Sequence, residues 1–256
     1  MLSRAVVRPP SVNFANGLTS VDLGMPVYGR ALEQHEAYCA ALTQCGLKLT
    51  RLEADERYPD STFVEDTAVL TEHCAILTRP GTPSRVGEVA GVESVLEELY
   101  SELPSLREPG RLDGGDICKA ENHFFIGISG RTNEAGAQQL AELLASFNYT
   151  SSFVDIREVN GILHLKSGVA YLGDKRMAVI EALRNREELR GYDLVRVQAG
   201  EDYAANCVRV NDHVLVAAGY PKTEKTLREL GYQTIALEMT EFQKMDGGLS
   251  CLSLRF

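Results

Sequence analysis

The chain has 256 residues, a formal net charge of −10 and a hydrophobic fraction of 44%. That fraction is enough to build a sizeable core, which excludes an intrinsically disordered protein. The acidic balance argues against nucleic acid as a partner, because phosphate recognition requires a basic surface.

The chain carries no targeting or membrane signal that we recognise. Its first ten residues hold an apolar stretch that is too short for a signal peptide, and no segment approaches the roughly 20 apolar residues that cross a bilayer. The six cysteines form no CxxC pair, so we expect free thiols rather than disulfides or a zinc site. No Pro/Gly/Ser-rich linker interrupts the chain. We therefore expect one domain, residues 1–256, in the cytoplasm.

One pattern of predicted elements recurs along the chain. Short apolar runs that end in a turn lie at 4–10, 74–83, 124–133, 168–176 and 214–223. Helical spacing of apolar residues follows each run, at 29–45, 85–101, 132–147, 175–190 and 222–230. Further strands are predicted at 47–53, 151–157, 192–198 and 232–239, and short ones at 67–70 and 116–120. The sequence therefore predicts a strand–helix–strand–strand unit, used about five times.

One such unit cannot bury its own apolar face, but several units packed around a common axis can. We therefore expect an α/β ring with helices outside and a polar centre. A doubly wound sheet is the competing prediction, because strands and helices alternate there as well. The first strand is not followed by a glycine-rich phosphate loop, which weakens the nucleotide-binding form of that alternative.

Two residues are candidates for nucleophilic catalysis. Cys251 follows Gly247 and Gly248, which permit a close approach of the backbone. His164 lies in the apolar stretch GILHLKSGVAYL, where it could act as a general acid or base near a thiol. Taken singly, a buried structural cysteine and a neutral core histidine are the more common outcomes. We expect the structural outcome for the other cysteines, which are Cys39, Cys45, Cys74, Cys118 and Cys207.

Acidic and basic candidates lie in three short segments. PDSTFVEDT at 59–67 contains Asp60, Glu65 and Asp66, and LDGGDI at 112–117 contains Asp113 and Asp116. Carboxylates beside buried apolar residues need a partner, which a cationic ligand would supply. Arg85 and Arg131 follow apolar runs in two of the repeats, and arginine suits bidentate binding of a carboxylate. Turn formation and a solvated surface are the ordinary alternatives for these residues.

The segments FVED, LDGGD, GRTN, HLKSG and DGGLSC occur in this order over the whole chain. In this order and at these separations they resemble the dimethylarginine dimethylaminohydrolase family, which belongs to the pentein, or guanidino-group-modifying, superfamily. The resemblance implies an α/β fold, a five-fold pseudo-symmetric propeller of ββαβ-type repeats in a single domain.

The resemblance also implies a role for each candidate residue. Cys251 would be the nucleophile, His164 the acid/base and Asp113, where some bacterial members carry a glutamate, the residue that orients His164. The implied substrate contacts fall into four groups: Asp60 and Asp66 for the guanidinium, Arg85 and Arg131 for the carboxylate, Leu18 and Met245 through their backbones, and Phe63 and Glu65 in the pocket wall.

The implied reaction is hydrolysis of an N-ω-methylated arginine to citrulline and a methylamine, through a cysteine-bound amidino intermediate. The guanidinium carbon is a poor electrophile, so a thiolate suits the attack. The implied partner is a small cationic amino acid, with no metal, organic cofactor, nucleic acid or membrane. A ring that exposes sheet faces and helices is also compatible with a homodimer.

Two alternatives remain open from the sequence. The first is an arginine deiminase-like enzyme, or another guanidine hydrolase or amidinotransferase, that uses an unmethylated guanidine. The second is a non-catalytic binding protein of the pentein fold, which would not need to keep the cysteine, the histidine and the acidic pairs. Substrate profiling separates the enzymes, and thiol labelling of Cys251 with and without substrate addresses the binding protein.

Overall fold

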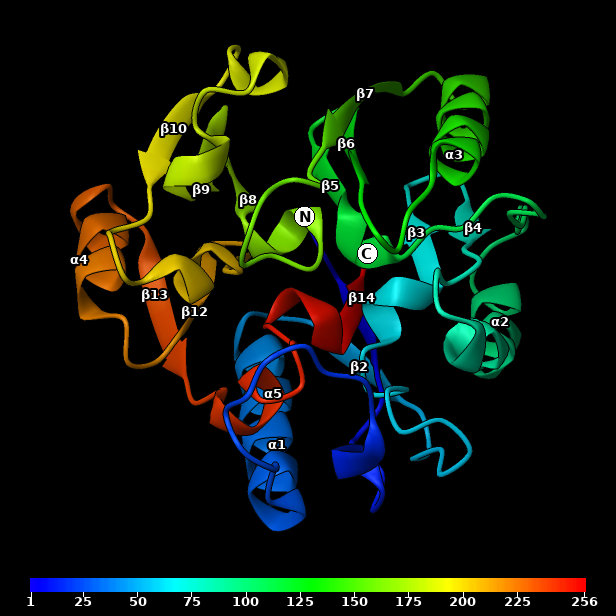
Figure 1. Ribbon diagram of the computed structural model, residues 1–256, viewed down its shortest axis with the longest axis horizontal. Coiled ribbons are helices and arrows are strands. Elements are labelled where there is room, and N and C mark those ends of the chain that lie inside the picture. The colour runs from blue at the N-terminus through cyan, green and yellow to red at the C-terminus, as the bar shows by residue number, and fades with distance from the viewer.

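The computed structural model describes residues 1–256 as a mixed α/β chain with five small, separate sheets. Figure 1 shows the sheets arranged around a common centre, with helices α1 to α4 toward the outside. Five separate sheets exclude the continuous doubly wound sheet that the sequence left open. No helix combines the length and the apolar character that a membrane span requires.

The sheets share one plan, which the first of them illustrates. The middle strand β1 (Arg4–Val7) pairs antiparallel with β14 (Ser253–Arg255) and parallel with β2 (Lys48–Arg51). Helix α1 (Tyr28–Gln44) connects the two parallel strands, since parallel neighbours need a crossover connection. Its buried residues, such as Tyr38 and Leu42, face the apolar core.

The remaining sheets repeat this plan with different crossovers. The third sheet consists of β5 (Ile117–Ala120), β6 (His123–Ile128) and β7 (Thr150–Asp155), with helix α3 (Glu134–Ser146) as the crossover. The fourth consists of β8 (Val169–Gly173), β9 (Arg176–Val179) and β10 (Asp193–Arg196). The fifth consists of β11 (Val208–Val210), β12 (His213–Ala217) and β13 (Gln233–Leu237), with helix α4 (Pro221–Glu229) between the last two. A short helix, α5 (Thr240–Gln243), follows β13.

The second sheet has only two strands, β3 (Ala68–Leu70) and β4 (Ala75–Leu77). The place of the third strand is taken by residues 102–106, which follow helix α2 (Ala90–Glu97). The Leu77 N–H donates to the Pro104 carbonyl at 2.8 Å, and the Leu106 N–H donates to the Leu77 carbonyl at 3.0 Å. The strand–crossover–strand plan is therefore present in this unit as well.

The prediction of a helix at 175–190 is wrong. Asp174 and Lys175 have positive φ angles of 52° and 58° and turn the chain between β8 and β9. Residues 176–179 then form β9, and only two short 3₁₀ turns, Glu181–Leu183 and Glu187–Leu189, follow. Met177, Ala178 and Val179 are all buried, and a strand that is buried on both faces has an apolar run that periodicity cannot distinguish from a helix.

Other predicted bounds differ in smaller ways. The helix expected at 85–101 is a 3₁₀ segment, Pro83–Glu88, followed by the eight-residue α2. Strands β9, β11 and β14 are absent from the predictions, and the last two have only three residues each. The helices predicted at 29–45, 132–147 and 222–230 are confirmed to within two residues at each end.

A short 3₁₀ turn precedes the strand that pairs antiparallel in every sheet, and we call these five segments the central turns. They are Val64–Thr67, Gly114–Asp116, Leu165–Ser167, Asp202–Ala205 and Ser250–Leu252. The first four turns contact one another in chain order, and Val64–Thr67 also contacts the last turn, Ser250–Leu252. Asn206, directly after the fourth turn, bonds to Ser250 and closes the ring. Apolar residues pack between the sheets and helices, whereas buried acidic residues such as Asp66 and Asp116 lie on the central turns.

Candidate active site

The central turns carry the residues that the sequence singled out for catalysis. Cys251 lies within the turn Ser250–Leu252, and Asp66 lies within Val64–Thr67. Asp113 and His164 each occupy the residue directly before a turn, in extended conformation. Because these turns meet at the centre, four segments that are far apart in the sequence converge on one cavity.

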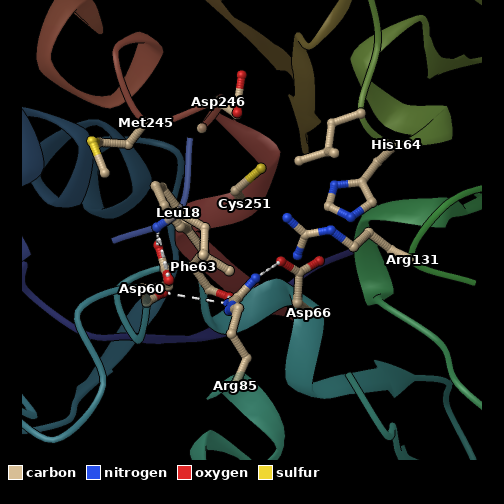
Figure 2. A pocket seen from close by; sticks show the side chains of 12 residues that line it. Leu18, Asp60, Phe63, Asp66, Arg85, Arg131, His164, Met245, Asp246 and Cys251 are labelled. Atoms are coloured by element: carbon tan, nitrogen blue, oxygen red, sulfur yellow. Dashed lines mark hydrogen bonds and ion pairs between the residues drawn. The ribbon is translucent and has the colours of Figure 1, made fainter. Parts of the chain in front are cut away.

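Figure 2 shows this cavity, with the side chains of Cys251, His164 and Asp66 facing the same space. Most of the predicted substrate-contacting residues line it: Leu18, Asp60, Phe63, Asp66, Arg85, Arg131 and Met245. Two predicted residues do not line it. Asp113 lies behind His164, and the Glu65 carboxylate is bonded to groups beneath Cys251.

His164 is held by a fully buried carboxylate. Its Nε2 lies 2.9 Å from Asp113 Oδ2, and the other carboxylate oxygen, Oδ1, accepts the Gly81 N–H at 2.7 Å. Asp113 therefore reaches His164 with hydrogen-bonding geometry. The second ring nitrogen, Nδ1, makes no hydrogen bond to the protein, so it is the one that can serve a ligand in the cavity.

The environment of His164 favours its charged form. Burial by itself lowers the pKa of the imidazole, but the negative charge of Asp66 and the hydrogen bond to Asp113 outweigh it. Together with the charges of Asp116 and Asp113, they raise the pKa of His164 to about 9. At neutral pH both ring nitrogens carry a proton, and Nδ1 presents a proton donor to the cavity.

Gly115 leaves room for the His164 ring. A Cβ atom at this position would lie 2.7 Å from His164 Nδ1 and 2.8 Å from Cγ, which is too close for any side chain. The Gly115 N–H also donates to Asp66 Oδ1 at 2.8 Å. The second glycine of LDGGD therefore acts in packing: it lets the imidazole lie against the backbone beside Asp66.

The surroundings of Cys251 favour the protonated thiol. Its side chain is only 8% exposed. Burial, followed by the negative charges of Glu65 and Asp66, raises the pKa of the thiol to about 12. A thiol of this kind becomes a good nucleophile only when positive charge is brought close to it, so the site favours reaction with a cationic ligand.

Asp66 stays ionised because of its partners. Its burial opposes ionisation, but Arg85, the His164 charge and the N–H of Gly115 more than compensate and lower the pKa of the carboxyl to about 2. Arg85 Nη1 donates to Asp66 Oδ2 at 2.6 Å. A negative charge thus lies permanently at the floor of the cavity, where a guanidinium or an imidazolium can pair with it.

The two candidate arginines differ in how far they are already paired. Arg85 is buried and also donates to Glu88, at 2.8 Å from Nη2 to Oε2, while its Nη1 group has one bond to Asp66 and a second hydrogen to spare. Arg131 is more exposed and its guanidinium has a single charged neighbour, Asp113, at 3.7 Å. Arg131 is therefore the freer of the two for an anionic ligand group.

The other side of the cavity is closed by the segment around Leu18. The Leu18 N–H donates to both carboxylate oxygens of Asp60, at 3.0 and 3.2 Å, so its carbonyl is the backbone group left for a ligand. Thr19 Oγ1 donates to the Lys244 carbonyl, and the Ser20 N–H donates to Asp246. These bonds attach the segment to the chain that leads into Cys251.

Three residues of the cavity wall are absent from the sequence predictions: Leu163, Asp246 and Gly247. Leu163 and Asp246 are adjacent to the predicted residues His164 and Met245, and Asp246 and Gly247 belong to the segment DGGLSC. The sequence signal that could have identified these three residues is their position beside or within the candidate motifs. Asp246 additionally has a positive φ of 57°, which a sequence does not reveal for aspartate.

The only candidate metal ligands in the site are Asp66, Asp113 and His164, whose ligand atoms lie within 4.8 Å of one another. Their charges are already paired. Asp66 neutralises Arg85, and Asp113 holds an imidazole that is protonated at neutral pH. An imidazolium has no lone pair to offer a metal ion, so the donor set fits a proton-transfer site better than a metal centre.

Known proteins resemble the chain along its entire length, although no family model matches it. An N(G),N(G)-dimethylarginine dimethylaminohydrolase of Pseudomonas aeruginosa is 41% identical over 257 residues and covers 100% of both chains. One from Streptomyces coelicolor is 37% identical and covers 98% of this chain and 96% of its own. The structure of a cysteine-to-serine mutant of the Pseudomonas enzyme, complexed with citrulline, superposes with a TM-score of 0.97 over 100% of both chains, at 40% identity. At this degree of identity over the full length, the chain belongs to the dimethylarginine dimethylaminohydrolase family.

Proposed function

We propose that the protein hydrolyses N-ω-methylated arginine to citrulline and a methylamine, with Cys251 as the nucleophile. The observation that carries this proposal is the cavity itself, which pairs a buried thiol with an imidazolium held by Asp113 and a permanently charged Asp66. The citrulline bound to the Pseudomonas relative supports a ureido product.

The first half of the reaction uses the substrate's own charge. The guanidinium binds against Asp60 and Asp66, and its positive charge favours loss of the Cys251 proton to solvent. The thiolate attacks the guanidinium carbon and forms a C–S bond. His164 Nδ1 then transfers a proton to the methylated nitrogen, the C–N bond breaks, and a methylamine leaves. An amidino-thioether cation remains on Cys251, stabilised by the two carboxylates.

The second half reverses the role of His164. The imidazole, now neutral, takes a proton from a water molecule as the water attacks the amidino carbon. The C–S bond then breaks, the thiol group of Cys251 is restored and citrulline is released. Asp113 keeps the ring in place in both halves, because its bond to Nε2 leaves Nδ1 facing the cavity.

Two structural expectations accompany this function. We infer that the five sheets form the five-fold pseudo-symmetric propeller expected of a pentein, in one domain over residues 1–256; the repeated plan of the sheets and the ring of central turns support this. We also infer that the enzyme works in the cytoplasm, which is consistent with six free cysteines that are all buried.

Substrate profiling tests the proposed function. The protein is incubated separately with dimethylarginine, monomethylarginine and arginine, and the ureido product and the released amine are measured. We expect kcat/KM to be larger for one of the methylated substrates than for arginine. Preferential release of ammonia from arginine would instead support a deiminase-type activity, and the absence of any ureido product would contradict a guanidine hydrolase.

Recognition of the substrate carboxylate should depend chiefly on Arg131. Hydrogen bonds to charged groups contribute about 1.5–3 kcal/mol, so Arg131→Ala should raise KM by about 10–100-fold and leave the melting temperature near that of the wild type. Arg85→Ala should instead lower stability by about 3–5 kcal/mol, because it leaves the buried Asp66 and Glu88 without their cation.

A decarboxylated substrate provides the control for this prediction. A methylated agmatine should be a poor substrate for the wild type. Its KM should change little in Arg131→Ala, because it has no carboxylate for Arg131 to bind. If the wild type processes methylated agmatine as well as methylated arginine, neither arginine binds a carboxylate. Steady-state kinetics and thermal unfolding of both variants provide the measurements.

A further inference from the structure

Beneath the cavity, four residues that do not line it form a closed circuit of hydrogen bonds. Glu65 Oε2 accepts from Ser250 Oγ at 2.7 Å, and Asn206 Nδ2 donates to the same Ser250 Oγ at 3.1 Å. Asn206 Nδ2 also donates to the Lys166 carbonyl at 3.1 Å, and Lys166 Nζ lies 2.6 Å from Glu65 Oε1. We call these four residues the central clamp.

Each member of the central clamp is adjacent in sequence to a residue of the cavity or to a central turn. Glu65 directly precedes Asp66, and Ser250 directly precedes Cys251. Lys166 follows His164 by two residues within the turn Leu165–Ser167. The clamp therefore connects the segments that carry the guanidinium-facing carboxylate, the nucleophile and the acid/base.

Asn206 provides the connection that the fourth central turn would otherwise lack. The turn Asp202–Ala205 contributes no residue to the cavity wall. Asn206, which ends that turn, accepts the Ser250 N–H on Oδ1 at 2.8 Å and donates both Nδ2 hydrogens to its neighbours. The rotated amide would place oxygen against the Lys166 carbonyl and nitrogen against the Ser250 N–H, so the network allows only one orientation.

Asn206 is also closely packed. Its side chain is nearly fully buried, and a Cβ atom at Gly248 would lie 2.5 Å from Asn206 Cγ. The amide thus lies flat against the backbone that leads into Cys251. Satisfied buried polar groups of this kind fix one arrangement of their neighbours, because each alternative leaves a donor or an acceptor unpaired.

We propose that Asn206 and Lys166 are positioning residues, which act through Ser250 and Glu65 to hold Cys251 at the distance and angle from His164 that the reaction requires. This inference rests on the proposed function of the cavity. Displacement of a reacting group by about 1 Å can cost about 100-fold in rate, whereas the substrate-facing groups Asp60, Asp66 and Arg131 are not members of the clamp. Loss of the clamp should therefore reduce kcat and leave KM almost unchanged.

The test compares Asn206→Ala, Lys166→Met and Lys166→Arg with the wild type. We expect Asn206→Ala and Lys166→Met to lower kcat by about 10–100-fold with KM within about twofold. Lys166→Arg should recover most of kcat, because arginine can still pair with Glu65. Lys119→Met is the matched control: Lys119 is a partly exposed lysine on β5 that pairs with Glu72 at 3.6 Å, outside the site. It should keep the wild-type kcat.

Alkylation of Cys251 by a neutral haloacetamide provides a readout that needs no substrate. Asn206→Ala removes no charge, so the pH dependence of alkylation should remain that of the wild type while kcat falls. Lys166→Met removes a positive charge near the thiol, so its alkylation should be slower at neutral pH. Unchanged kcat in folded Asn206→Ala and Lys166→Met, or a loss of kcat that Lys166→Arg shares in full, would overturn the proposal.

The design separates this proposal from the proposed function. All kinetic ratios are taken with the guanidine substrate that the wild type turns over fastest, whether methylated or not. If the wild type prefers arginine, the proposal of a methylated substrate is wrong. The ratios of kcat and KM between variant and wild type still test the central clamp. Thermal unfolding of each variant identifies any loss of kcat that arises from unfolding at the assay temperature, and a loss explained wholly in that way counts against the clamp.

Discussion

Replacing Cys251 with serine should reduce turnover on the order of 10⁴–10⁶-fold, which is the usual cost of removing a catalytic nucleophile. The alcohol is a far weaker nucleophile than a thiolate, and the cationic substrate cannot ionise it at neutral pH. Serine is nearly the size of cysteine, so the fold should be retained and the substrate should still bind. Rapid-quench measurement of released amine, together with substrate binding by calorimetry, checks both parts.

A buried cysteine outside the site is the control for this variant. Cys118 lies in the apolar core on β5 with 3% of its surface exposed. Cys118→Ala should lower the free energy of unfolding by about 1–3 kcal/mol through lost packing, with kcat unchanged. Near-normal turnover by Cys251→Ser would end the covalent mechanism. Equal losses of turnover in the two variants would indicate a general effect on folding instead.

Replacing His164 with glycine should reduce turnover by about 10²–10⁴-fold, the typical contribution of a positioned proton donor. The imidazolium is expected to protonate the leaving amine, and the neutral ring to activate water. The loss should persist at a pH at which the thiol ionises readily. Turnover and alkylation of Cys251 are measured side by side, and acid quench shows whether covalent adduct accumulates.

The pH dependence of the wild type follows from two groups. The reactive form needs Cys251 as thiolate and His164 as imidazolium, whose pKa values are raised to about 12 and about 9. Below pH 9 the imidazolium is complete and the thiolate fraction grows about tenfold per pH unit, so kcat/KM should rise. Above pH 9 imidazolium is lost as fast as thiolate is gained, so kcat/KM should level off.

His164→Gly should remove the change of slope near pH 9, because the group that titrates there is gone. The low kcat/KM of this variant should then keep rising with the thiolate fraction without reaching the wild-type value. Full recovery of turnover at high pH, in proportion to alkylation, would show that His164 only lowers the pKa of the Cys251 thiol and does not act as the acid or base. A wild-type profile that levels off near neutral pH would show that one of the two groups titrates well below its raised pKa, and the pH dependence of Cys251 alkylation would identify which.

The sequence by itself predicted the family, the repeated unit and most of the residues that line the cavity. Motifs such as HLKSG and DGGLSC could be recognised because the chemistry demands particular residue types near one another along the chain. The structure and the comparisons confirm the resemblance and the family. They also place Cys251, His164 and Asp66 around one cavity. The catalytic role of each residue stays a prediction that the variants above test.

Only the tertiary structure decided which of the predicted residues face the cavity and which support it. Glu65 and Asp66 are neighbours in sequence, yet a 3₁₀ turn directs Asp66 into the cavity and Glu65 toward Ser250 and Lys166 beneath it. Likewise, Arg85 and Arg131 look equivalent in sequence, but burial between Asp66 and Glu88 distinguishes the first from the second.

The strand β9 and the residue Asn206 are two further features that the sequence alone could not identify. An apolar run such as residues 176–180 fits a helix or a doubly buried strand equally well, and only pairing with β8 and β10 selects the strand. Asn206 is ordinary in its own sequence context, and it gains importance from Lys166 and Ser250, which are 40 and 44 residues away. Local sequence specifies turns and apolar faces, whereas contacts between distant segments exist only after the chain has closed around its centre.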